Sequence, residues 1–565
     1  MSDQEFTPLH LSPLEPRRSK EPPLRIMDNP LLIAQARRQL RQRQLGVTVG
    51  IGLILGLLTI LSIFAIKESQ PLGGEKLDFL STLWASGRQT LTFIILYSLY
   101  WRGGSVISSA ITGEKSSGIF TFLKATPLSP LSLAFGYLFG LPIRGYLLTL
   151  TILPFWMFCG LMEGVGVLSL IIGMILILLG AITLHSMILA FSFSQEGKTL
   201  KWGAPLLKLG LFIFAEPLNQ MGLHTIAHLT PFPSLGSLEL TLISSAIKRE
   251  EVFFYAFSMP SIFYTLLIQG LMIGLCLWVT SRKITYASQP LMSRIGGLSA
   301  LMVLLLILIG VDLNPNAINM GAQMNTSFSK LPGGMILLVL GILLGALLIF
   351  ISAPSRLSAI RDMNRQRRLV QEPHTPQIPW SHEGASVLPL TLMIVGVTTA
   401  LMCFYFYNYG GPFYTDLLWS EGIFSATLSA SSCLIAFSGI CEYLKSNSHR
   451  WRYLLTLQFY TMLLFLLPII LGLIWGQIGA QSQLIYALSP LYSFAYAIIH
   501  LTFKVTGEHP EVTEHLQWLT FKYFLFSSSV GVMIGGGCYR LAYQARQALF
   551  NPHQDLAETS HLERS

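Results

Sequence analysis

The chain has 565 residues, of which 52% are hydrophobic and 12% are charged, whereas soluble domains carry about 25% charged residues. This deficit excludes an ordinary soluble protein, because a soluble core cannot hide many apolar stretches of about 20 residues. The net charge of +9 comes from arginine and lysine residues that cluster between apolar runs, as the positive-inside rule predicts. We therefore attribute the charge to membrane topology and expect no nucleic-acid partner.

The N-terminal segment, residues 1–28, is polar and contains several prolines, so we expect it to be disordered and cytoplasmic. Asn29 and Pro30 then predict the start of a helix, because asparagine caps helices and proline fits their first turn. Apolar residues line one side of this helix, which predicts an amphipathic helix on an anionic cytoplasmic leaflet. The alternative is a basic flank without defined docking. The basic side carries Arg37, Arg38, Arg41 and Arg43.

Apolar runs along the rest of the chain predict an all-α fold, a polytopic transmembrane bundle of about twelve spans. The basic residues between the runs place both termini in the cytoplasm. The expected spans are 46–66, 89–111, 133–158, 165–193, 205–218, 261–280, 296–311, 333–352, 387–407, 422–443, 453–475 and 518–541. The expected units are a first membrane half (29–284), two spans with a basic cytoplasmic linker (285–385), the remaining spans (386–545) and a cytoplasmic tail (546–565).

A short polar segment, residues 112–130, separates the second and third expected spans and reads TGEKSSGIFTFLKATPLSP. Ile119, Phe120 and Leu123 share one face at helical spacing, so we expect one amphipathic helix over 112–124 at the membrane surface. Pro127 and Pro130 are expected to end it. From the residues alone, an ordinary interfacial helix explains the segment equally well.

The same segment resembles the coupling region of ATP-binding-cassette (ABC) transporter permeases of the type-2 export class. The pattern of that region is roughly Glu-Arg-Glu-x-Gly-Thr-Leu-x-x-Leu-x-x-Thr-Pro-Leu-Ser. An elbow helix that begins with Asn-Pro, as here, also resembles this family. Departures are Lys115 for arginine, Ser116 for the second acid, and Ile119 and Phe120 for Thr-Leu. Positions that keep the pattern are Glu114, Gly118, Leu123, Thr126, Pro127, Leu128 and Ser129.

The resemblance implies a permease subunit that exports a substrate when cytoplasmic ABC ATPase subunits, as a dimer, press on the coupling and elbow helices. A second permease copy is a possible partner beside the lipid bilayer of the cell membrane. Glu114, Lys115 and Lys124 are then the expected polar contacts to the ATPase, with the three apolar residues anchoring the helix. The chain contains no Gly-rich phosphate loop with the Gly-Lys-Ser/Thr ending. We therefore expect no enzyme activity and no cofactor of its own, with ATP bound by the partner.

Other ionisable residues give weaker signals. Arg102 follows an apolar run and precedes two glycines, so it is a candidate intramembrane polar site. His224 and His228 are spaced to share a helix face, but no third ligand is near in sequence, so we expect no metal site. The six cysteines show no CxxC spacing and are expected to be packing residues.

Two other functions remain open at this point. The first is a secondary transporter driven by an ion gradient, although no series of acidic residues suggests a proton relay. The second is a membrane scaffold or assembly protein that transports nothing. Neither alternative requires an ATPase partner.

Overall fold

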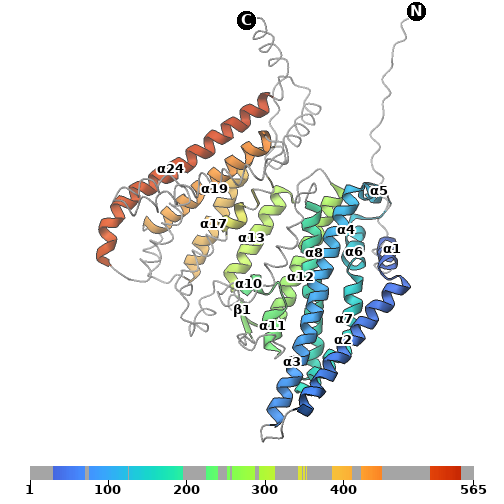
Figure 1. The fold of residues 1–565 in the computed structure, drawn as a ribbon. Helices are drawn as coiled ribbons and strands as arrows, with labels where there is room; N and C mark the ends of the chain where they lie inside the picture. Colours follow the sequence, from blue (N-terminus) through green and yellow to red (C-terminus); the bar gives the residue numbers. More distant parts are fainter. Residues whose placement is uncertain are drawn as a thin grey trace, which may run out of the picture.

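The computed structural model describes residues 29–69, 76–124, 126, 128–194, 224–238, 251–254, 257–286, 292–311, 341–346, 348–349, 352, 385–409, 421–447 and 510–548. Most of these residues are helical, and the long helices lie side by side as a bundle (Figure 1). Six of the helices are long and apolar enough to cross a membrane, namely Gln42–Lys67, Ile143–Glu163, Val167–Phe193, Ser261–Thr285, Arg294–Val311 and Thr427–Lys445. The chain is therefore a membrane-embedded helical protein. The expected number of twelve stays a prediction, because spans such as 205–218 and 453–475 lie outside the described residues.

The N-terminal part of the bundle contains eight described α-helices and one π-helix. In chain order these are α1 (Pro30–Gln39), α2 (Gln42–Ser69), α3 (Lys76–Leu96), η1 (Tyr97–Gly103), α4 (Gly104–Ser116), α5 (Ile119–Lys124), α6 (Pro130–Gly140), α7 (Ile143–Glu163) and α8 (Val167–Ser194). Asn29 caps α1 by accepting hydrogen bonds from the amides of Leu31 and Leu32, as its sequence predicts. At the other kind of helix end, a glycine caps the C-terminus of α7: Gly164 adopts a left-handed conformation with φ of 98°.

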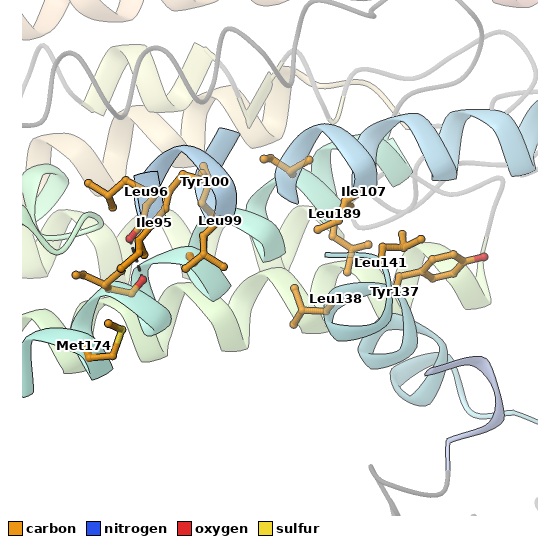
Figure 2. Close-up of a cluster of buried hydrophobic side chains, with 14 of the residues drawn as sticks. Ile95, Leu96, Leu99, Tyr100, Ile107, Tyr137, Leu138, Leu141, Met174 and Leu189 are labelled. Carbon is orange, nitrogen blue, oxygen red and sulfur yellow. Dashed lines mark hydrogen bonds between the residues drawn. The ribbon is translucent and has the colours of Figure 1, made fainter. Parts of the chain in front are cut away.

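The second expected span is one continuous helical rod, formed by α3, η1 and α4 between Lys76 and Ser116. We expected Arg102 and the adjacent glycines to interrupt it, and the interruption is a π-helical turn rather than a break. The side chains labelled in Figure 2 show how this rod packs against α6 and α8. Buried residues such as Leu99, Ile107 and Leu138 belong to one hydrophobic core that these helices share.

The segment before the sixth expected span is more deeply placed than expected. Its elements are α10 (His224–Ala227), α11 (Phe232–Ser237), and the antiparallel strands β1 (Glu251–Phe254) and β2 (Phe257–Pro260). We expected residues 224–258 to be exterior, but a Cβ atom on Gly180, in the middle of α8, would lie 2.9 Å from Pro231. The α10–α11 segment thus enters the bundle from the end that carries β1 (Figure 1). The strictly all-α expectation is wrong at the β1–β2 hairpin.

The C-terminal part of the described chain contains α12 (Ser261–Thr285), α13 (Arg294–Val311), α17 (Leu388–Tyr409), α19 (Glu421–Asn447) and α24 (Pro510–Ala548). Helices α19 and α24 pack closely, because glycines face each other at their contact. A Cβ atom on Gly439 would lie 2.6 Å from the carbonyl oxygen of Gly535. Small residues allow such close approach between membrane helices.

Candidate functional site

The segment that resembles a coupling region forms one end of the bundle, where α5 lies beside the end of α4 and the start of α6 (Figure 1). We call this the α5 end. We expected a single helix over 112–124, but the chain divides it at Gly118, whose φ is 77°. Only glycine adopts that conformation without strain, so the rod ends at Ser116 and α5 is a separate six-residue helix. Pro130, expected to end a helix, instead starts α6, with Ser129 as its cap.

Glu114 is buried at the α5 end, with 7% of its surface exposed. The amide of Gln35 in α1 donates a hydrogen bond to one carboxylate oxygen at 3.1 Å, and the hydroxyl of Tyr137 in α6 donates to the other. We expected this carboxylate to contact an ATPase directly. Its two oxygens are instead bonded within the bundle, so Glu114 joins α1, α4 and α6.

Lys115 contacts the end of α8. Its Nζ donates to the carbonyl oxygens of Ser192 and Phe193 at 2.9 and 3.0 Å, and lies 5.3 Å from the centre of the Phe193 ring. Carbonyls in the last turn of a helix have no partner within the helix, so a cation there is favourable. Lys115, also expected to be an ATPase contact, therefore caps α8.

The apolar residues of α5 divide between the bundle and solvent. Phe120 is 9% exposed, and its ring packs 5.1 Å from that of Phe193, so it anchors the helix as expected. Leu123 is half-buried against the same core. Ile119 was expected to anchor as well, but it is 50% exposed, and the neighbouring Phe122 is 73% exposed. The outer face of α5 thus presents two large apolar side chains.

Helix α1 packs against α6 through two glycines. A Cβ atom on Gly136 would lie 2.9 Å from Leu31, and one on Gly140 would lie 2.9 Å from the Cβ of Gln35. The side chain of Asn29 also donates to the carbonyl of Ser132 at 2.6 Å. The elbow helix is therefore fixed to the bundle. Pro30 is its first residue, and Arg37, Arg38 and Arg41 are exposed.

Arg102 is exposed on the outside of η1, so the structure does not place it in an internal polar site. The buried polar group at this level is His185 of α8. Its Nε2 lies 2.8 Å from the carbonyl oxygen of Leu99, which can only accept, so Nε2 carries the proton. Its Nδ1 then accepts from the hydroxyl of Tyr146, 3.1 Å away. The sequence predicts that a single histidine such as His185 hydrogen-bonds within the bundle, as it does here, but a lone histidine in an apolar run gives no sign of its partners.

A second buried carboxylate performs a similar task in the C-terminal part. Glu442, near the end of α19, is 2% exposed and accepts from the Val387 amide at 2.8 Å and the Ser386 hydroxyl at 3.0 Å. Arg294 donates to the carbonyl oxygens of Ala385 and Ser386 at 2.6 and 2.8 Å. Glu442 and Glu114 thus each lie near the end of a helix. Glu442 binds the two residues just before α17, and Glu114 binds side chains of α1 and α6.

Some expected site residues are only partly described. The side chain of Lys124 and the whole of Pro127 lie outside the described residues, whereas the Thr126 hydroxyl donates to the carbonyl of Leu123 at 2.6 Å. Within the described part of the chain, no group of three or more His, Cys, Asp or Glu side chains could hold a metal ion. His228 instead lies 2.6 Å from the Thr265 hydroxyl of α12.

Comparison of the chain with protein-family models, curated proteins and solved structures finds no match. The resemblance to type-2 ABC permeases therefore depends on the α5 segment and the Asn29-Pro30 helix.

Proposed function

We propose that this protein is the membrane-spanning subunit of an ABC-type exporter, and that a separate ATPase subunit docks on α5. The observation that carries the proposal is the combination of an exposed apolar face on α5 with rigid bracing behind it. Ile119 and Phe122 project outward, whereas Phe120 is anchored beside Phe193. An exposed pair of large apolar side chains at the end of a bundle favours a protein partner.

The bracing gives the mechanism. Force applied to α5 reaches α4 through the short Ser117–Gly118 connection, because α5 begins directly after it. Glu114 then passes the displacement to α1 and α6, and Lys115 passes it to α8. Each of these hydrogen bonds involves the ionisable side chain of Glu114 or Lys115, and hydrogen bonds to charged groups are stronger than those between neutral groups. Docking at α5 would thus reorient several spans together, as alternating access requires.

An ATPase co-purification experiment tests this proposal. The tagged chain is purified from its native membranes in mild detergent, and bound nucleotide-hydrolysing activity is measured, with the partner identified by its phosphate-binding loop. We expect activity with the wild type and its loss in Phe122→Asp. The matched control is Phe257→Asp on β2, which is also 73% exposed but lies directly before α12 and not at the α5 end.

Both substitutions are at exposed positions, so each is expected to change the free energy of unfolding by no more than about 0.5 kcal/mol. Phe120→Ala, in contrast, is expected to destabilise by about 3 kcal/mol, because it empties a buried site. ATPase activity that Phe122→Asp leaves unchanged, or that is absent from the wild type, would contradict the proposal.

The His185 network favours a second candidate function, a secondary transporter driven by an ion gradient. An ionisable side chain buried among membrane helices is a functional candidate by default. His185 is fully buried and bonded to Tyr146 and the Leu99 carbonyl. Substrate uptake into sealed vesicles separates the two: transport that persists without ATP but stops when the ion gradient is collapsed would favour the second candidate.

A further inference from the structure

We propose that the corner between α1 and α2 binds the headgroups of anionic phospholipids through Arg37, Arg38, Arg41 and Arg43. All four side chains are exposed. Among the described residues, none of them has an ion-pair partner. This inference does not depend on the proposed transport function.

Within the described residues, no acidic side chain neutralises the corner. The sequence contains no aspartate or glutamate between Asn29 and Lys67. Glu114 reaches α1 through Gln35, but it is buried and both of its oxygens accept hydrogen bonds. The four guanidinium groups therefore form a local positively charged cluster that faces outward, and guanidinium geometry matches phosphate oxygens well.

The position of the arginines along α2 identifies the anion as a lipid. Leu45, Val47 and Ile51 are 41%, 55% and 45% exposed, and only 17% of the most apolar window of α2 is buried. This helix thus faces lipid along most of its length. Arg43 precedes Leu45 by two residues, about 3 Å along the helix axis. The guanidinium groups consequently lie where hydrocarbon meets headgroups.

One side of helix α1 is committed to the bundle rather than to the bilayer. Leu31 and Gln35 are buried against Gly136 and Gly140 of α6, whereas Ile33, on the side where the sequence predicts the apolar face, is 36% exposed. Arg144 of α7 fixes the end of the helix by donating from Nε to the carbonyl of Gln39 at 2.6 Å, and it also bonds Gln44. The corner is therefore held by the bundle, and its arginines remain available for headgroup phosphates.

Native mass spectrometry of the full chain tests this. The protein, purified in mild detergent, is incubated with equal amounts of phosphatidylglycerol and phosphatidylcholine, and bound lipids are counted. Each arginine near an anionic headgroup contributes roughly fivefold in affinity. We expect the variant with Arg37, Arg38, Arg41 and Arg43 changed to Gln to bind phosphatidylglycerol at least tenfold more weakly, with phosphatidylcholine binding unchanged.

The control variant is Lys67→Gln combined with Arg540→Gln, two exposed cations away from the corner, Lys67 being at the other end of α2; we expect this variant to bind like the wild type. Millimolar inorganic phosphate should not displace the lipid; displacement would assign the site to free anions and overturn the proposal. Equal phosphatidylglycerol binding by the wild type and the four-Gln variant would also overturn it. The wild type alone gives a further test, because its lipid preference must weaken as NaCl rises from about 50 to about 500 mM.

Discussion

Gln35 in α1 and Glu114 in α4 lie 79 positions apart, yet the Gln35 amide donates to the Glu114 carboxylate at 3.1 Å within a buried contact. Tyr137 of α6 bonds the other oxygen of the same carboxylate. One side chain thus joins the elbow helix, the long rod and the start of the next span. The segment that carries the resemblance to coupling regions is therefore not an independent surface loop, and displacement of α5 must act on all three helices.

Glu114→Lys is expected to destabilise the fold, because it places an unpaired cation in a buried site built for a carboxylate. We expect a loss of about 3–5 kcal/mol in the free energy of unfolding, measured by denaturation in detergent micelles. Ser116→Lys is the matched control, since Ser116 is exposed two residues further along α4, and it should cost less than about 0.5 kcal/mol. Equal stability of the two variants would show that Glu114 does not hold α1 and α6.

His185→Leu is expected to destabilise the η1 turn. The Leu99 carbonyl would lose its partner in an apolar interior, which costs about 1–3 kcal/mol. Tyr146→Phe removes only the hydrogen bond to Nδ1, so we expect a smaller loss of about 1 kcal/mol. Thermal unfolding of the two variants checks the order; a larger effect from Tyr146→Phe would contradict the assigned donor and acceptor roles.

Arg88 and Glu163 form an ion pair between α3 and α7, with Nε to Oε2 at 2.5 Å and Nη2 to Oε1 at 3.0 Å. Arg88 is buried, so Glu163→Leu alone leaves an uncompensated charge and is expected to cost about 3–5 kcal/mol. Arg88→Met combined with Glu163→Leu should recover most of that loss, because two apolar residues replace a fully desolvated pair. A double-mutant cycle that shows simple additivity would argue against the pairing.

Gly439→Ala, at the α19–α24 contact, and Gly536→Ala, at an exposed position of α24, form a matched pair. A Cβ atom on Gly439 meets the Gly535 backbone at 2.6 Å, whereas one on Gly536 meets nothing within 4 Å. Backbone atoms cannot move aside as a flexible side chain can. Gly439→Ala is therefore expected to lower the free energy of unfolding by about 1–3 kcal/mol. Gly536→Ala should be neutral or stabilising by up to about 1 kcal/mol, because alanine is the better helix former. Similar unfolding temperatures for both variants would contradict the close α19–α24 contact.

Local sequence signals predicted the local structure of the α5 end well. The Asn29-Pro30 pair predicted the start of α1, and the apolar period predicted that Phe120 would be buried. The helix face was wrong at Ile119 because the prediction assumed one helix over 112–124. Gly118, with its positive φ, separates α4 from α5, so the two helices do not share one helical register. A glycine within a predicted helix is a known sign of such a break.

Long-range partners could not be predicted in the same way. The sequence around Glu114 predicts an exposed acid in a polar segment. Only the packing of α1 against α6 places Gln35 and Tyr137 around it. The same limit applies to Glu442 of α19, which is buried beside the start of α17 and accepts from the Val387 amide, 55 positions away. Periodicity identifies which side of a helix is apolar, but it does not identify which distant polar group will satisfy a carboxylate there.

An ATPase can dock on α5 only if α5 faces the compartment in which ATP is hydrolysed, and this can be tested by the side of the membrane on which Phe122 lies. Phe122→Cys and Phe257→Cys, each in a background with the exposed Cys403 changed to Ser, are labelled in sealed vesicles with a membrane-impermeant thiol reagent. We expect position 122 to react only from the cytoplasmic side and position 257 only from the opposite side. Labelling of position 122 from the external side would rule out ATPase docking on α5.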